Sequence, residues 1–127
     1  MVVGGDSGDS GDAGSLAKTE VLDIRKMAFA PGPSMGSSRG ACAAVPVDAQ
    51  HVLVIGGRAS SMLALATTEL LDVAALEFSP GPTMQRAHKN AATVRLDAAG
   101  DGRRILVLGG GFSTTEMLAV DAQTGAR

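Results

Sequence analysis

The stretch TEVLD, residues 19–23, recurs as TELLD at residues 68–72. Each copy is followed at the same spacing by a phenylalanine, a Pro-Gly-Pro triplet and a methionine, which are Phe29, Pro31–Pro33 and Met35 in the first copy and Phe78, Pro80–Pro82 and Met84 in the second. Corresponding residues are 49 positions apart, as from residue 19 to residue 68. A sequence period of about 20–50 residues is typical of solenoids, propellers and arrays. The chain is therefore predicted to consist of repeated structural units.

Three short apolar runs each end in a pair of glycines. The runs are Val2–Val3, Val52–Ile55 and Ile105–Leu108, and the pairs that end them are Gly4 with Gly5, Gly56 with Gly57, and Gly109 with Gly110. Apolar runs that are rich in β-branched residues and stopped by glycine indicate buried strands. Glycine can adopt backbone conformations that a Cβ atom would forbid. We expect a strand that ends in a sharp change of direction at each of the three places.

Further strands are expected at Glu20–Ile24, at Ala28–Ala30 and at Gly40–Val47, where small side chains suit a crowded inner position. The last of these aligns with Asn90–Leu96 at the same spacing of 49. Proline limits the second strand at Pro31, because it cannot donate to a ladder. A helix over Ala59–Ala66 is the alternative reading of that segment, because alanine, methionine and leucine favour helices.

Composition places the chain among ordinary globular domains and excludes several classes. It has 127 residues, of which 45% are hydrophobic and 19% are charged, with three Phe and no Tyr or Trp. A core built from aliphatic side chains and methionine predicts modest stability, because aromatic residues bring the largest buried areas. The net charge of −2 is spread along the chain, which gives no support to nucleic-acid binding. A single cysteine, Cys42, excludes an internal disulfide.

No apolar run approaches the length of a membrane span. The first residues lack the basic start and apolar stretch of a secretory signal. We therefore expect a cytoplasmic protein that neither spans a membrane nor binds one.

Taken together, these residues resemble Kelch repeats, the units of Kelch-type β-propellers, whose period is about 50 residues. The family pattern is an apolar strand ending in two glycines, a Glu-x-aromatic-Asp strand, a Trp, and then a Met and an Arg before the next blade. The matching residues are the three glycine pairs, Glu20 with Asp23, Glu69 with Asp72, Met35 with Arg39, and Met84 with Arg86.

The chain departs from the family pattern in three ways. Leu22, Leu71 and Val120 stand at the aromatic position, and Phe29 and Phe78 stand at the Trp position. In the last copy, aligned through Asp72 and Asp121, the Trp position falls on Arg127, and Glu116 lies two positions too early.

The resemblance implies an all-β fold in which antiparallel, four-stranded Kelch-like blades form an incomplete β-propeller. The expected units are a partial blade at 1–35, a complete blade at 36–84 and an incomplete blade at 85–127. Propellers typically close with about 4–8 blades. An open array exposes unpaired strand edges, so self-association through these edges is expected.

Three motifs resemble known catalytic or ligand-binding motifs, and an ordinary loop or strand end is the preferred interpretation of each. Gly5–Gly8 resembles the nucleophile segment of chymotrypsin-like proteases, but no histidine and aspartate are placed to activate the serine. Asp6, Asp9 and Asp12 are three apart, whereas an EF-hand needs carboxylates two apart and a Glu at its end. Gly109–Gly111 supplies only part of a dinucleotide fingerprint, because Thr114 replaces the third glycine.

Several single residues are also candidates. Arg39 and Arg86 are candidate partner contacts, although hydrogen bonds to blade-connecting backbone are the favoured reading. Cys42 is expected to be buried and inert, and His51 and His88 are expected in loops. The methionines other than the first are read as core or loop anchors, at Met27, Met35, Met62, Met84 and Met117.

The resulting functional expectation is a non-enzymatic module that binds an unknown protein partner and needs no metal or cofactor. Loops on a rigid scaffold are the usual position of binding residues. The Kelch resemblance implies roles such as a substrate adaptor of a ubiquitin ligase or a cytoskeletal scaffold. The alternatives are a Rossmann-type nucleotide binder that uses the Gly109–Gly111 loop and a fragment of a Kelch-propeller enzyme.

Overall fold

The chain is an all-β protein in its computed structural model, which describes residues 2–5, 16–61, 63–96, 104–110 and 115–120. Within these residues there are ten strands and no helix, and hence no helix able to cross a bilayer. The strands are β1 (Val2–Val3), β2 (Thr19–Asp23), β3 (Ala28–Pro31), β4 (Ala43–Pro46), β5 (His51–Ile55), β6 (Thr68–Asp72), β7 (Glu77–Pro80), β8 (Ala92–Leu96), β9 (Arg104–Leu108) and β10 (Thr115–Ala119). The predicted all-β fold class is confirmed.

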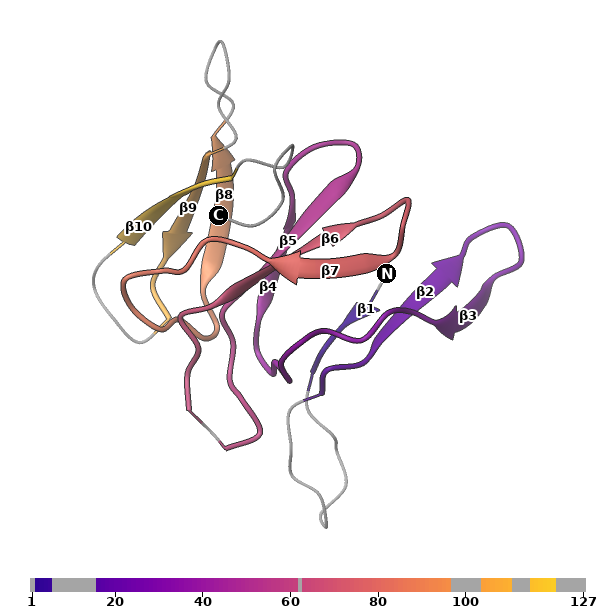
Figure 1. The fold of residues 1–127 in the computed structure, drawn as a ribbon, viewed down its shortest axis with the longest axis horizontal. Coiled ribbons are helices and arrows are strands. Elements are labelled where there is room, and N and C mark those ends of the chain that lie inside the picture. The colour runs from indigo at the N-terminus through magenta and orange to yellow at the C-terminus, as the bar shows by residue number, and fades with distance from the viewer. Residues whose placement is uncertain (1, 6–15, 62, 97–103, 111–114, 121–127) are drawn as a thin grey trace.

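The ten strands form three antiparallel sheets in chain order (Figure 1). The first sheet is β1-β2-β3, the second is β4-β5-β6-β7 and the third is β8-β9-β10. Each strand pairs with the strand next to it in sequence, which is the pairing that short connections allow. The strands of each sheet lie within one of the expected units, 1–35, 36–84 and 85–127. The described residues do not close into a ring.

The outer hairpins of the first two sheets are built alike. Asp23 ends β2 and its side chain accepts hydrogen bonds from the backbone N–H groups of residues 25 and 26. Asp72 ends β6 and accepts in the same way from residues 74 and 75. Each turn then contains a non-glycine residue at positive φ, Met27 at 51° and Leu76 at 54°. The conserved spacing of 49 between these residues shows that the backbone conformation repeats with the sequence.

Replacing Asp72 by alanine should lower the free energy of unfolding by about 1 kcal/mol, because two backbone donors in the turn lose their acceptor. Asp72→Asn keeps an oxygen acceptor and should cost less than half as much. Urea unfolding followed by far-ultraviolet circular dichroism measures both values. An equal loss in the two variants would show that the charge, and not the turn, is what Asp72 supplies.

Two expected strands are present but shorter than predicted. The strand expected at Gly40–Val47 is confined to β4, because Ala41 adopts a positive φ of 51° that breaks the extended backbone. Asn90 has a φ of 54° and sets the start of β8 at Ala92 in the same way. The alternative helix over Ala59–Ala66 is absent from the residues described there.

The segment from residue 58 to residue 64 folds back on itself. Arg58 forms isolated antiparallel bridges with Gly40 and with Ala64, and Ala59 donates its N–H to the carbonyl of Leu63. Leu65 then donates its N–H to the carbonyl of Gly57 and brings the chain back to the second sheet. Good helix formers at these positions are overridden by pairing with distant backbone.

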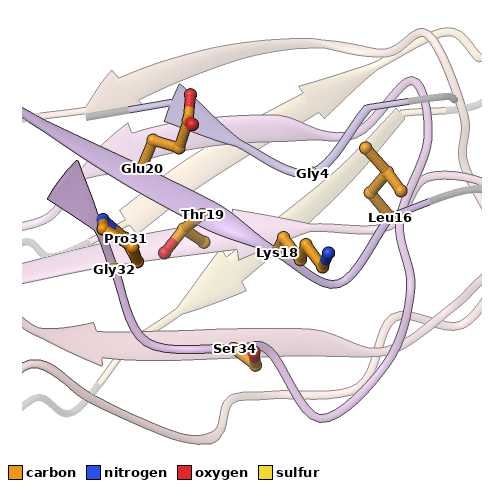
Figure 2. Close-up of a pocket in the computed structure, with 8 residues that line it drawn as sticks. All are labelled: Gly4, Leu16, Lys18, Thr19, Glu20, Pro31, Gly32 and Ser34. Atoms are coloured by element: carbon orange, nitrogen blue, oxygen red, sulfur yellow. The ribbon is translucent and has the colours of Figure 1, made fainter. Parts of the chain in front are cut away.

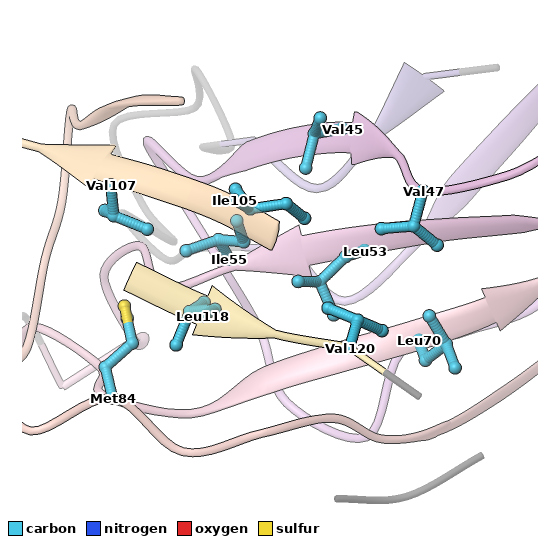
Figure 3. Packing of buried hydrophobic residues seen from close by; sticks show 10 residues of the cluster. All are labelled: Val45, Val47, Leu53, Ile55, Leu70, Met84, Ile105, Val107, Leu118 and Val120. Carbon is cyan, nitrogen blue, oxygen red and sulfur yellow. The ribbon is translucent and has the colours of Figure 1, made fainter. Parts of the chain in front are cut away.

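The main apolar core lies between the second and third sheets (Figure 3). It consists of Val45, Val47, Leu53, Ile55, Leu70, Met84, Ile105, Val107, Leu118 and Val120. Met84 belongs to the segment that connects these two sheets, and it packs beside Leu118 (Figure 3). No residue of the first sheet belongs to this cluster within the described chain. The first sheet is therefore attached mainly through the connecting segment that follows it.

The glycine pairs have the unusual backbone that was predicted. All six glycines have positive φ, between 59° for Gly56 and 114° for Gly5. At Gly56 the reason is also steric, because a Cβ atom there would collide with the carbonyl oxygen of His88 in the segment leading to the third sheet. The pair thus allows one strand end to touch the next connecting segment.

Candidate interaction site at the sheet junctions

The junction between the first and second sheets is centred on the carboxylate of Glu69. Its Oε1 accepts from the backbone N–H of Gly36 at 2.5 Å, and its Oε2 accepts from Ser37 N–H at 3.2 Å and from Arg39 Nε at 2.9 Å. The three donors belong to the segment connecting the two sheets, whereas Glu69 lies in β6. One buried side chain therefore holds the connecting segment on the second sheet.

Arg39 uses its remaining donors on the same sheet. Its Nη1 donates to the carbonyls of Gly56 at 2.9 Å and Thr67 at 2.8 Å, and its Nη2 donates to Thr67 Oγ1 at 3.0 Å. The residue is only 1% exposed, so its charge is compensated almost entirely by the ion pair with Glu69 at 2.9 Å. The geometry agrees with the structural reading of Arg39, because the guanidinium has no exposed face for a partner.

The junction between the second and third sheets repeats this arrangement with a histidine. Glu116 in β10 accepts from the backbone N–H groups of Gln85 at 2.6 Å and Arg86 at 2.9 Å. His88 takes the place of Arg39, with Nε2 at 2.8 Å from Glu116 and Nδ1 at 2.6 Å from the carbonyl oxygen of Gly109. His88 lies in a loop, as expected, but it is a buried junction residue and not an isolated one.

The two ring nitrogens of His88 contact two different strands' ends. One lies beside the Glu116 carboxylate of β10 and the other beside the carbonyl oxygen of Gly109, which follows β9. Arg39 joins Glu69 of β6 to the carbonyl of Gly56, which follows β5, in the same way.

The alignment of the third copy at a constant spacing of 49 was wrong. Glu116 takes the role of Glu69, and Leu118 follows it as Leu71 follows Glu69, so the true spacing in this strand is 47. The Thr-Glu dipeptide that begins β2, β6 and β10 was the signal that could have found this correspondence. Arg127, to which the constant spacing gave the Trp position, lies outside the described residues.

Arg86 does not correspond to Arg39. Counting four residues from Met35 and Met84 leads to Arg39 and His88, and these are the residues that the junctions use. The exposed Arg86 contributes its backbone N–H to Glu116. The sequence comparison matched Arg86 with Arg39 because both are arginines, although they lie at different distances from the preceding methionine.

Acid should weaken the second junction through Glu116. Burial alone would raise the pKa of this carboxyl, but hydrogen bonds from the Gln85 N–H, the His88 ring and the Arg86 N–H outweigh it, so the pKa lies below its usual 4.5. A carboxyl whose pKa is lower in the folded state stabilises the fold above its unfolded pKa and loses that contribution as the pH falls through the folded value.

We therefore expect the stability difference between the chain and Glu116→Gln to be present above pH 4.5 and to shrink as the pH falls through the lowered pKa of Glu116. Urea unfolding at a series of pH values measures it. A difference that grows toward acid pH would contradict this role of Glu116.

In the first sheet, the equivalent carboxylate belongs to Glu20. Thr19 and Thr68 precede Glu20 and Glu69, and each donates its hydroxyl hydrogen at 2.6 Å to the second proline carbonyl of its Pro-Gly-Pro triplet. The Glu20 side chain is exposed and forms no hydrogen bond or ion pair within the described chain. A connecting segment thus binds the equivalent carboxylate in two sheets, whereas no described residue binds it in the first sheet.

The equivalent phenylalanines of the first and second sheets also differ in exposure. Phe78 is partly buried and lines the groove beside the connecting segment on the second sheet. Phe29, its equivalent in the first sheet, is 56% exposed. The face of the first sheet that carries Glu20 therefore lacks the cover that the second sheet has within the described residues.

Two other candidate residues have structural contacts. Cys42 lies before β4, and burial raises the pKa of its thiol, which keeps the thiol protonated and a poor nucleophile. His51 begins β5, where its Nδ1 lies 3.0 Å from a carboxylate oxygen of Asp48, so it is not an isolated loop residue. Of the methionines, Met35 and Met84 are buried, whereas Met27 and Met117 are exposed and Met62 lies outside the described residues.

The remaining motif-based sites divide into two groups. Asp6, Asp9 and Asp12 and most of the protease-like Gly5–Gly8 segment lie outside the described residues. The dinucleotide reading of Gly109–Gly111 is contradicted, because β9 leads into the antiparallel β10 and not into a helix and a parallel strand. The described residues contain no cluster of three or more possible metal ligands.

No protein-family model matches the chain, and no match was found among the curated proteins.

Proposed function

We propose that the chain is a non-enzymatic protein-interaction module made of Kelch-like blades, which binds polypeptide segments at the junction faces of its sheets. The observation that carries this proposal is the repeated junction, in which Glu69 and Glu116 each bind two consecutive backbone N–H groups and one arginine or histidine side chain. A carboxylate that binds two consecutive backbone donors recognises a bent polypeptide segment and needs no particular side chain at those two positions.

The open strand edges support the same proposal. β1 and β10 are edge strands of their sheets in the described chain, and edge strands present unpaired backbone groups to other chains. The Kelch resemblance supports a module whose partners are proteins, either as a substrate adaptor or as a cytoskeletal scaffold. A cytoplasmic location fits both roles.

Selection of a displayed random-peptide library on the immobilised chain tests the proposal. We expect enrichment of peptides that bind the purified chain in solution, and sedimentation velocity should show concentration-dependent self-association through the edges. Failure to enrich any binding peptide, together with a monomer at every concentration, would overturn the proposal.

A further inference from the structure

The exposed face around Glu20 contains a groove of about 540 Å³ (Figure 2). The groove is lined by Gly4, Leu16, Lys18, Thr19, Glu20, Pro31, Gly32 and Ser34. Figure 2 shows Glu20, Thr19 and Lys18 along one strand, with Pro31 and Gly32 at one end and Gly4 and Leu16 at the other. The residues come from the first sheet and from the segments that directly adjoin it.

In the second sheet, the connecting segment that contains Arg39 occupies the equivalent position. Gly4 N donates to the carbonyl of Lys18 as Gly56 N donates to that of Thr67, so Gly4 and Lys18 match two residues that bind Arg39. Glu20 matches Glu69 by its position in the strand. The groove around Glu20 thus presents two carbonyls and a carboxylate in the arrangement that binds the connecting segment elsewhere.

From this repeated geometry we propose that the Glu20 groove binds a segment of a second polypeptide that has the donor pattern of the two connecting segments. This inference rests on the proposed function and names the chemistry of the partner. The segment presents backbone N–H groups at two consecutive positions to Glu20 and a donating His or Arg side chain two positions later. The spacing is that of Gly36, Ser37 and Arg39 and of Gln85, Arg86 and His88.

A methionine directly precedes the two backbone donors in both connecting segments. Met35 and Met84 are 5% and 4% exposed, and each donates its N–H at 2.8 Å to a carbonyl just before a strand, that of Ala17 before β2 and that of Ala66 before β6. An apolar residue at this position therefore completes the segment. The partner is expected to carry a methionine or a similarly flexible apolar residue there.

Lys18 should make the Glu20 groove prefer a different partner side chain from the arginine that the second sheet binds. Thr67 accepts a hydrogen bond from Arg39 through its hydroxyl, whereas the matching Lys18 places a positive charge on the same strand position. A like charge nearby disfavours a permanently charged guanidinium. The Glu20 groove should therefore bind a segment with histidine in preference to one with arginine, and Lys18→Thr should reduce this preference.

Fluorescence anisotropy with labelled, end-capped peptides tests the inference. The probes are residues 83–89 (TMQRAHK), the same peptide with His replaced by Arg, and the same peptide N-methylated at the Gln and Arg nitrogens that correspond to residues 85 and 86. N-methylation removes the two backbone donors without changing the net charge. A scrambled peptide of the same composition controls for general attraction to the acidic chain.

We expect saturable binding of the His peptide that falls at least tenfold on N-methylation and at least tenfold in Glu20→Ala. Glu77→Ala, an exposed carboxylate of β7, serves as the matched control and should change the affinity less than twofold. Lys18→Thr should tighten binding of the Arg peptide by about threefold, the size of an exposed charge interaction.

Binding that survives N-methylation or Glu20→Ala would overturn this inference. The library selection separates that failure from failure of the proposed function. Selected peptides that bind Glu20→Ala as tightly as the unaltered chain would leave the interaction module standing and remove only the Glu20 groove. Failure to enrich any peptide would remove both.

Discussion

Arg39→Ala should lower the free energy of unfolding by about 3–5 kcal/mol, the usual cost of removing one partner from a buried ion pair. The substitution leaves the Glu69 carboxylate buried with only two backbone donors, and it removes one donor each from the carbonyls of Gly56 and Thr67. The first sheet then loses its main attachment, because none of its described residues belongs to the apolar core between the other sheets.

Urea unfolding followed by circular dichroism measures this loss, since the chain has no Tyr or Trp for fluorescence. Arg25→Ala, in the exposed turn after β2, is the control and should change stability by less than about 0.5 kcal/mol. If Arg39→Ala were as mild as the control, the junction would not hold the sheets together.

Gly56→Ala should lower the free energy of unfolding by about 2–5 kcal/mol, the sum of two separate costs. One part of the cost is the positive φ of 59°, which disfavours any residue with a Cβ by roughly 1–2 kcal/mol. The other part is the collision of the new methyl group with the carbonyl oxygen of His88, which forces backbone to move at about 1–3 kcal/mol.

Gly109→Ala separates these two contributions. Gly109 is the equivalent glycine of the third sheet, with a φ of 74°, and no atom lies within 4 Å of a Cβ built there in the described structure. Its substitution should show the cost of positive φ alone, about 1–2 kcal/mol. Equal losses at the two positions would mean that contact with the neighbouring connecting segment does not restrict Gly56.

The sequence was sufficient to predict most of the strands and the 49-residue period of the first two copies, because both leave local patterns. Paired glycines after apolar runs mark β5 and β9, and the repeated TEVLD and TELLD stretches mark β2 and β6. These patterns are set by backbone geometry within a few residues. They therefore survive in a chain whose aromatic residues are almost absent.

The sequence was insufficient for the residues of the junctions, because their partners are about 30 positions apart and change type. Arg39 and His88 are different amino acids in one role, and only their common position relative to Glu69 and Glu116 reveals it. The changed spacing before Glu116 hid the second pair further. The exposure of Glu20 depends on what covers a sheet face, which periodicity does not encode.

The burial of the strands has a consequence for the time scale on which parts of the chain open. The middle sheet has a neighbour on both sides, and most residues of β5 and β6 are buried, whereas every residue of β3 in the first sheet is exposed. In linear arrays each unit is stabilised by its neighbours. Backbone amides of β5 should therefore exchange with deuterium most slowly and those of β3 most rapidly, so that the array frays inward from its ends.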